Sequence, residues 1–323
     1  MRNIVTAFKD KKILLVGDAI IDMYIHGRVS GQALGASVPR VLEERSTHTF
    51  GGNGLVAANM LELGGTVYFV SVIGADEDAK LYDALKHSKL KKFFFTDASR
   101  RTTVKKRVFG DGVRLLHLNK VDNHGISKPL EKKIVKQIAS LMPKVDKVVI
   151  MDPQHGLMTR GLIETIKNLS GKYQKPLYVD AQVSHKNSNH HYYKGADTMI
   201  LNEKEAKAAD PRFDTNNAES SMRDLRKKFK LQNVIVKLGE SGSMGLFGNH
   251  FIQTPGYKVK AVDAWGAGDA FLAAYALGDT THLEEALRLA NMWAGLSTTV
   301  AGTTPPKKKD LVKALKVRHA KVK

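Results

Sequence analysis

The chain of 323 residues contains no cysteine. Without thiols the protein can form neither disulfide bonds nor thiolate metal sites, so we expect a reducing, intracellular setting. No apolar run approaches the ~18 residues that a membrane-spanning helix needs, and the N-terminus lacks the pattern of a signal peptide. We therefore predict a cytoplasmic protein that has no membrane as a partner.

Acidic residues are scarce, because 32 Asp and Glu face 51 Lys and Arg, which gives a formal net charge of +19. Part of the excess lies in a basic tail at about 305–323, which we expect to fray after the sequence AGTTPP. A basic surface attracts nucleic acids, phosphorylated metabolites or acidic lipids, although a solvated lysine-rich surface is the simpler explanation. No nucleic-acid-binding motif is visible, so a nucleic-acid partner is not expected.

Hydrophobic residues make up 42% of the chain and aromatic residues 7%, which suits a buried core and argues against global disorder. Short runs rich in Val and Ile predict strands, namely KILLVGD, VYFVSVIG, KVVIMD, LYVDA, TMILN and NVIVKLG. Between them lie helix-like stretches, which include GLVAANMLELGG, DAKLYDALKHSKL, PLEKKIVKQIASLMPK and SMRDLRKKFK. This alternation predicts an α/β fold with a mainly parallel sheet and helices on both faces.

Polar residues close four of the predicted strands, at Asp18, Asp152, Asp180 and Asn202. The carboxyl ends of parallel strands meet at one edge of the sheet, and ligands bind beyond that edge. We therefore expect the functional site there. Asp180 has two open interpretations, since it could hold a water on Mg²⁺ or cap the next turn.

Two stretches, at about 23–50 and 100–122, interrupt the alternation with period-two patterns and turn residues. The second contains TTVKKRVFGDGVRLLHL, which predicts a hairpin around Gly110, Asp111 and Gly112. We interpret the two stretches as β excursions that form a small lid on a single domain covering residues 1–323.

A glycine-rich turn leads into a helix at Gly266, Ala267, Gly268 and Asp269. The N-terminus of a helix exposes backbone N–H groups and the positive end of the helix dipole. Small residues there let an anion approach these N–H groups. Asp269 beside that anion suits a base that takes the proton from an alcohol attacking a phosphoryl group. With the ordinary Asp pKa of about 3.9 it would be ionised near pH 7. The alternative is a tightly packed helix start, with Asp269 as a dipole partner.

Several segments, in order, resemble the PfkB/ribokinase family of sugar kinases. DAWGAGDAF resembles its motif D-T-x-G-A-G-D-x-F, and FGGNGLVAANMLELGG resembles its N-terminal glycine motif. GDAIIDMY resembles the first strand, NEKE the family's N-x-x-E, VKLGESGS the nucleotide-side loop, and LANMWAGLSTTVAG the adenine-pocket helix and loop. The resemblance covers nearly the whole chain.

The resemblance implies a ribokinase-like three-layer α/β/α sandwich and an ATP-dependent carbohydrate kinase, a phosphotransferase with an alcohol group as acceptor. It implies Asp269 as base, with the N–H groups of residues 266–268 around the transferred phosphoryl group. The implied sugar contacts are Asp22, Gly51, Gly52 and Asn53. The implied ATP contacts are Asn202, Lys237, Gly239, Gly242, Asp263, Asn291 and Gly302. Mg²⁺ is expected near Glu205 and Asn202, with a monovalent cation such as K⁺ near Asp263. We further expect Trp265 and Trp293 to pack around the nucleotide.

Within the family, the closest resemblance is to the heptose-7-phosphate kinases of ADP-heptose synthesis. GDAIIDMYIHG, SVPRVLEERS, GGNGLVAAN and TTVKKRV follow their motifs in order and spacing. A phosphorylated sugar suits a basic lid, in which Lys105 and Arg107 share one strand face and Lys106 takes the other. The alternative for these three residues is a charged edge strand that resists aggregation.

Two departures lie on the sugar side of the motifs. Ala264 replaces the usual Thr, and Leu55 replaces a sugar-binding Asn of the glycine motif. Other acceptors therefore stay open, a ribose- or fructose-type sugar or a nucleoside. A polyanion- or nucleic-acid-binding protein on a kinase scaffold is the alternative from another class. Lid strands in this family often pair between subunits, so the resemblance implies a homodimer.

Overall fold

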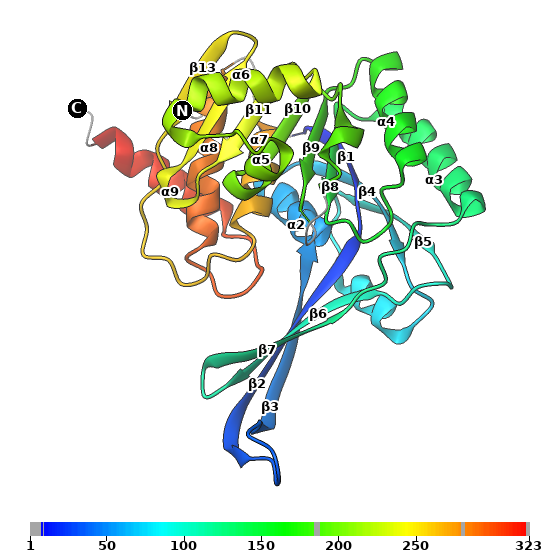
Figure 1. The fold of residues 1–323 in the computed structure, drawn as a ribbon, viewed down its shortest axis with the longest axis vertical. Helices are drawn as coiled ribbons and strands as arrows, with labels where there is room; N and C mark the ends of the chain where they lie inside the picture. The colour runs from blue at the N-terminus through cyan, green and yellow to red at the C-terminus, as the bar shows by residue number, and fades with distance from the viewer. Residues whose placement is uncertain (1–7, 9, 184–187, 279–281, 321–323) are drawn as a thin grey trace.

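A nine-stranded sheet forms the centre of the molecule in a computed structural model that describes residues 8, 10–183, 188–278 and 282–320 (Figure 1). The strand order is β13-β12-β11-β10-β9-β8-β1-β4-β5. The strands are β1 (Lys12–Val16), β4 (Thr66–Ile73), β5 (Leu90–Thr96), β8 (Lys147–Asp152), β9 (Leu177–Ala181), β10 (Thr198–Asn202), β11 (Asn233–Lys237), β12 (Ser243–Phe247) and β13 (His250–Thr254). All neighbours pair in parallel except β12, which is antiparallel to β11 and β13.

Helices cover both faces of this sheet, as the alternation of strand and helix patterns predicted. One face carries α2 (Asn53–Leu63), α7 (Ala267–Leu277), α8 (Leu283–Ser297) and α9 (Lys308–Ala320), and the other carries α3 (Lys128–Leu141), α4 (Arg160–Lys172), α5 (Glu203–Ala209) and α6 (Ala218–Phe229). Two separate hydrophobic clusters fill the spaces between the sheet and the two helix layers. The predicted three-layer sandwich is confirmed.

The sequence patterns of the helices follow their burial. The α3 helix begins after the N-cap Ser127, and it buries one stripe that includes Ile134, Ile138 and Leu141. In contrast, α7 buries every residue from 270 to 277, because it packs between the sheet, α2 and α8. The helix that carries the glycine-rich turn is therefore anchored on all sides.

All six predicted strands are present as β1, β4, β8, β9, β10 and β11. The helix predicted over DAKLYDALKHSKL is wrong, because residues Glu77–Ala84 form a 3-10 helix and β5 begins at Leu90. Fraying directly after AGTTPP is not seen, since α9 starts at Lys308, where the backbone N–H donates to Glu62 Oε1 at 2.9 Å, and the last part of the predicted tail, 321–323, lies outside the described residues. Among the described residues, no helix is long and apolar enough to cross a membrane.

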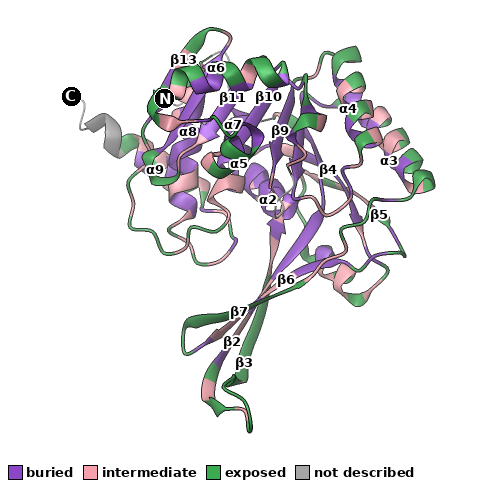
Figure 2. Ribbon diagram, in the orientation of Figure 1, coloured by how far each residue is buried: buried purple, intermediate pink, exposed green. Residues whose placement is uncertain are grey.

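A second sheet projects from the body as a lid, with the strand order β3-β2-β6-β7 (Figure 1). Its strands are β2 (Ala19–Gln32), β3 (Pro39–Gly52), β6 (Thr103–Gly110) and β7 (Val113–Lys120). The predicted hairpin joins β6 to β7, and its turn uses positive φ angles of 48° at Asp111 and 79° at Gly112. Much of the lid is exposed, whereas the strands of the body are buried (Figure 2).

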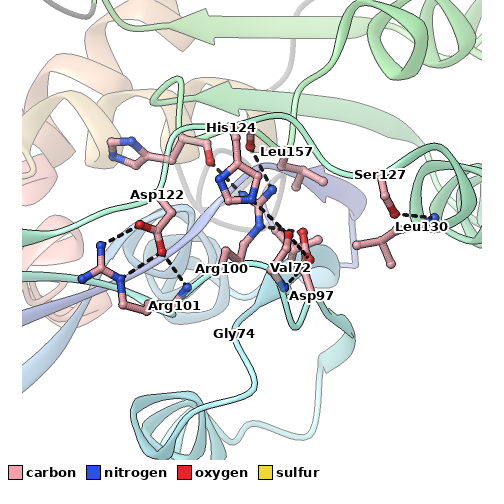
Figure 3. A network of polar contacts seen from close by, with 12 residues as sticks. Val72, Gly74, Asp97, Arg100, Arg101, Asp122, His124, Ser127, Leu130 and Leu157 are labelled. Carbon is pink, nitrogen blue, oxygen red and sulfur yellow. Dashed lines mark hydrogen bonds and ion pairs between the residues drawn. The ribbon is translucent and has the colours of Figure 1, made fainter.

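Both ends of the β6–β7 hairpin are tied to the body at its base (Figure 3). The buried Arg100 pairs with Asp97 at 2.8 Å and donates to the carbonyl oxygens of His124 and His155. Next to it, Arg101 pairs with Asp122 at 2.6 Å. These bonds join the segment before β6 to the segment after β7, so the root of the lid has a defined position.

Candidate active site

The turn before α7 requires glycine at position 266. Gly266 has φ 81°, and a Cβ atom there would lie 2.3 Å from Leu55 Cδ2. The helix then begins without a side-chain cap, so its first N–H groups are not covered by a side chain. The glycine-rich motif predicted three N–H groups around an anion, but Ala267 N already donates to Ala264 O at 3.3 Å.

The carboxylate of Asp269 lies in the first turn of α7 and is partly buried. It makes no hydrogen bond or ion pair within the described part of the chain. Burial and the charge of Asp180 raise the pKa of Asp269 to about 8, against the lowering effects of Lys237 and Lys105. The expectation of an ordinary Asp pKa is therefore not met, because burial and the neighbouring charge of Asp180 both disfavour the ionised form. The side chain is free to exchange a proton near neutral pH.

Asp180 at the end of β9 forms an ion pair with Lys237 at the end of β11, with 2.5 Å between Oδ2 and Nζ. Although burial opposes it, the charges of Asp180 and Glu205 raise the pKa of Lys237, which therefore stays protonated. A Cβ atom on Gly268 would lie 3.5 Å from Lys237 Nζ. A cation thus lies directly beside the glycine-rich turn, which favours an anion there. Neither open interpretation of Asp180 foresaw this pair.

Asn202 and Glu205 form a reciprocal capping box at the start of α5. Asn202 N donates to Glu205 Oε2 at 2.7 Å, and Glu205 N donates to Asn202 Oδ1 at 2.9 Å. Burial and the charge of Asp180 raise the pKa of Glu205 to about 7. The N-x-x-E motif therefore has a local structural role as well as its place at the sheet edge.

The described residues contain no group of three acidic or histidine side chains placed to hold a metal ion by themselves. Mg²⁺ commonly binds through one or two carboxylates together with substrate phosphates and waters. Asp180 and Glu205 interact electrostatically at this edge, and burial raises the pKa of Glu205. A divalent cation would relieve that repulsion, so the donor set fits magnesium held jointly with a phosphorylated ligand.

On the lid side of the site, Asp22 is buried and paired. Its Oδ1 lies 2.8 Å from Arg107 Nη1, and its Oδ2 accepts a hydrogen bond from Thr303 Oγ1 at 3.0 Å. A Cβ atom on Gly51 would lie 2.5 Å from Asp22 Oδ2, so only glycine fits beside this carboxylate. Gly52 follows at φ 51°, where α2 begins. The structure thus brings Asp22, Gly51 and Arg107 together.

Lys105 lies opposite Asp22 in the pairing of β2 with β6. Burial lowers the pKa of Lys105, while the charges of Asp22 and Asp269 oppose this effect. Lys105 therefore interacts electrostatically with Asp22 of the lid and with Asp269 of the body.

Asn53 points into the protein. It is buried, and its Nδ2 donates to Met151 O at 2.8 Å and Asp18 O at 3.2 Å. Its amide nitrogen thus holds the ends of β1 and β8 together, and the sugar contact expected of Asn53 stays a prediction. Leu55 is buried under Gly266, so it packs against the turn where the glycine motif usually has a sugar-binding Asn.

The residues expected on the ATP side lie on different elements, because Asp263 and Gly302 belong to loops and Asn291 lies within α8. Asp263 accepts from Trp265 N and from Gly302 N, each at 3.1 Å, and so connects the loop before α7 with the loop after α8. Asn291 donates to Thr254 Oγ1 at 2.7 Å, which occupies its amide nitrogen inside the protein. Gly239 and Gly242 flank a 3-10 turn with φ angles of 59° and 102°.

Both tryptophans differ from the expectation that they pack around the nucleotide. Trp293 is fully buried and donates to Asn59 Oδ1 at 2.8 Å, inside the helix layer. Trp265 instead faces the lid, where it contacts Arg107, Arg114 and His117. Thr303, Arg114 and His117 were not predicted as site residues, although the period-two pattern of β7 placed the last two on one strand.

A family model described as pfkB family carbohydrate kinase matches residues 10–310. The chain therefore belongs to the pfkB family of carbohydrate kinases, as its motifs predicted, and the predicted class of enzyme is confirmed. It is 30% identical to a bifunctional protein HldE of Aliarcobacter butzleri, over 89% of this chain and 61% of that protein. A bifunctional protein HldE of Trichlorobacter lovleyi is 28% identical over 95% of this chain and 63% of its own length. The chain thus spans less than two thirds of the length of these relatives.

Solved structures support the fold. Ribokinase of Arabidopsis thaliana, in complex with ribose and ATP, aligns with a TM-score of 0.73 at 20% identity, over 95% of this chain and 99% of that chain. Phosphofructokinase-2 of Escherichia coli, in complex with substrates and products, aligns with a TM-score of 0.75 at 17% identity, over 94% and 97%. These likenesses confirm the ribokinase-like fold class.

Proposed function

We propose that this chain is an ATP-dependent kinase that transfers the γ-phosphoryl group of ATP to a hydroxyl of a sugar phosphate, with heptose-7-phosphate as the favoured acceptor. The observation that carries the proposal is the carboxylate of Asp269, which has no partner among the described residues, in the first turn of an uncapped helix beside Lys237. The motif resemblance to heptose-7-phosphate kinases supports the acceptor. A cytoplasmic setting stays a prediction.

In the proposed reaction, the acceptor oxygen attacks the γ-phosphorus, and the bond from this phosphorus to the bridging oxygen of ADP breaks. The hydroxyl proton passes to the carboxylate of Asp269, and ADP leaves. The N–H groups at the start of α7 and the ammonium of Lys237 stabilise the charge on the phosphoryl oxygens. Base catalysis of this kind contributes roughly 10²–10⁴-fold to the rate.

Asp180 and Glu205 would hold Mg²⁺ together with the phosphates of ATP. The ion would neutralise negative charge on the phosphate oxygens. On the protein side, the ion pair with Lys237 fixes the position of the Asp180 carboxylate, and the capping box fixes the side chain of Glu205. A monovalent cation near Asp263 stays part of the proposal.

The acceptor is tested by measuring ADP formation from ATP and Mg²⁺ with a panel of acceptors. The panel contains heptose-7-phosphate, ribose, fructose, fructose-6-phosphate and nucleosides, and ³¹P NMR identifies the product. We expect kcat/KM for heptose-7-phosphate to exceed the others by at least about 10-fold, because a phosphate contact is charge-assisted. Equal or better turnover of ribose or fructose would replace this acceptor with the other sugars that the sequence left open.

We also propose a homodimer formed through the lid, with a second copy of the chain as the partner. In β7, Leu116 and Leu118 are 53% and 55% exposed, and they alternate with inward-facing residues. On the opposite edge of the sheet, the side chain of Leu42 on β3 is also exposed. Because β3 and β7 are the two edges of the lid sheet, each offers a strand edge that can pair with a second chain.

A further inference from the structure

The strand register of the lid defines an inner face that carries mostly basic and aromatic side chains. Three cross-strand rows contain Asp22, Lys105 and Asn119, then Tyr24, Arg107 and His117, then His26, Phe109 and Arg114. Side chains in adjacent strands at paired positions point to the same face. Asp22 is the one acidic residue in these rows, so the inner face has an excess of positive charge.

Three of these basic groups converge on Trp265, which belongs to the loop just before Asp269. Arg107 and Arg114 lie 4.8 Å and 5.3 Å from the centroid of the indole ring, and the His117 ring lies 5.5 Å from it. Stacking on an aromatic face fixes the plane of a guanidinium group while its N–H donors remain available. Trp265 itself is 45% exposed, so a ligand can reach this cluster.

The cluster lacks compensating negative charge. Arg107 uses the Asp22 carboxylate, whereas Arg114 has neither a hydrogen bond nor an ion pair within the described ranges. Burial and the positive charges of Arg114 and Arg107 lower the pKa of His117. The negative charge of Asp22 opposes this effect, but it is the smallest of these influences. An anion placed between Arg114 and His117 would relieve the mutual repulsion of these groups.

We propose that Arg114 and His117, oriented by Trp265 and adjacent to Arg107, bind a phosphomonoester group that the acceptor already carries. The proposal rests on the proposed kinase function, because the hydroxyl of the same acceptor would lie at Asp269. Lys105 interacts electrostatically with both Asp22 and Asp269, and it lies in the row of the inner face next to Arg107, which contacts Trp265. The fork of a guanidinium group matches the geometry of phosphate oxygens, which favours phosphate as the ligand.

The kinetic test compares Arg114→Gln with Lys106→Gln, because Lys106 lies on the same hairpin but faces away from Trp265. For heptose-7-phosphate, we expect Arg114→Gln to raise KM about 10- to 100-fold, the usual effect of losing a charge-assisted contact. KM for ATP and for the same heptose without its phosphate should change less than about 2-fold. An equal rise for the two heptoses, or no rise for heptose-7-phosphate, would overturn the proposal.

A binding measurement with inorganic phosphate tests the subsite without turnover. Phosphate should quench the fluorescence of Trp265, with Trp265→Phe as the blank, and should raise the pKa of His117 measured by NMR. Both effects should be lost in Arg114→Gln and kept in Lys106→Gln. Absence of these effects in the wild-type protein would overturn the subsite. Phosphate binding without turnover of heptose-7-phosphate would instead contradict only the proposed acceptor.

Discussion

The body and the lid contribute opposite charges to the site. At the edge of the body, burial raises the pKa of Asp18 to about 7, of Glu205 to about 7 and of Asp269 to about 8. The facing side of the lid instead presents Lys105, Arg107 and Arg114, and burial lowers the pKa of Lys105. Away from Lys237, carboxylates of this edge repel phosphate groups when they ionise, so binding of a phosphorylated acceptor also depends on the lid and on a divalent cation.

The two regions also differ in how firmly their residues are held. In the body, the turn at Gly266 and the pair of Asp180 with Lys237 lie on elements whose cores are buried. In the lid, apolar side chains lie in the open, up to Leu34 with 99% exposure (Figure 2). We infer that the body supplies the chemistry, which needs fixed geometry, and the lid supplies recognition.

The largest expected effect is on the body. Asp269→Asn keeps the shape of the side chain but removes the base, so kcat should fall by about 10²–10⁴-fold. Steady-state kinetics measure kcat, and calorimetric titration with ATP should give an unchanged Kd. A variant that retains near-normal kcat would show that Asp269 is only a dipole partner of α7.

A second effect concerns the outer face of the lid. Leu116→Asp combined with Leu118→Asp places charges in the proposed dimer interface, where each buried Leu would otherwise contribute about 1.5–3 kcal/mol. The wild-type protein should be dimeric by light scattering, and the variant monomeric, with an unchanged circular dichroism spectrum. A monomeric wild-type protein would contradict this role for the lid.

A smaller effect is expected from Arg107→Lys, which keeps the charge beside Asp22 but loses the planar stacking on Tyr24 and Trp265. KM for the acceptor should rise by about 10-fold, while kcat changes less. Lys106→Gln is the matched control, as it faces away. A fall in kcat without a change in KM would show that Arg107 takes part in the chemical step. It would contradict the inference that the lid supplies only recognition.

The smallest effect is on stability and depends on pH. The pKa of Asp269 is about 8 in the folded protein, against an ordinary value of 3.8 in an unfolded chain. The folded state therefore binds this proton more tightly, and the resulting stability is complete below pH 3.8 and is lost as the pH rises to about 8. Asp269→Asn should thus be more stable than wild type at pH 8.5, and the difference in unfolding free energy should shrink as the pH falls toward 4.

Denaturant unfolding at both pH values measures this difference. Asp224→Asn is the control, because Asp224 is exposed on α6. A constant difference between Asp269→Asn and wild type at the two pH values would contradict the raised pKa of Asp269.

The body could be predicted from sequence because buried parallel strands are continuous apolar runs with polar ends. Asp152 and Asn202 do end β8 and β10, as expected. Local periodicity was misleading at residues 78–90, where apolar residues at helical spacing form a 3-10 helix and then the start of β5. There, pairing of β5 with β4 outweighs the local pattern.

The site could be predicted only as far as motifs carry it. The position of Asp269 after a glycine-rich turn is a local property, whereas the pair of Asp180 with Lys237 joins residues 57 positions apart. The contacts of Trp265 depend on a lid hairpin that lies far away in the sequence. Likewise, the raised pKa of Asp269 results from burial and from charges on other elements, which the sequence does not reveal.

The most direct test of the division between body and lid is a crystal structure with heptose-7-phosphate and a non-hydrolysable ATP analogue. We expect an acceptor hydroxyl within hydrogen-bonding distance of Asp269, and the acceptor's phosphate against Arg114 and His117. A sugar bound with its phosphate at the edge of the body, or with no hydroxyl near Asp269, would contradict it.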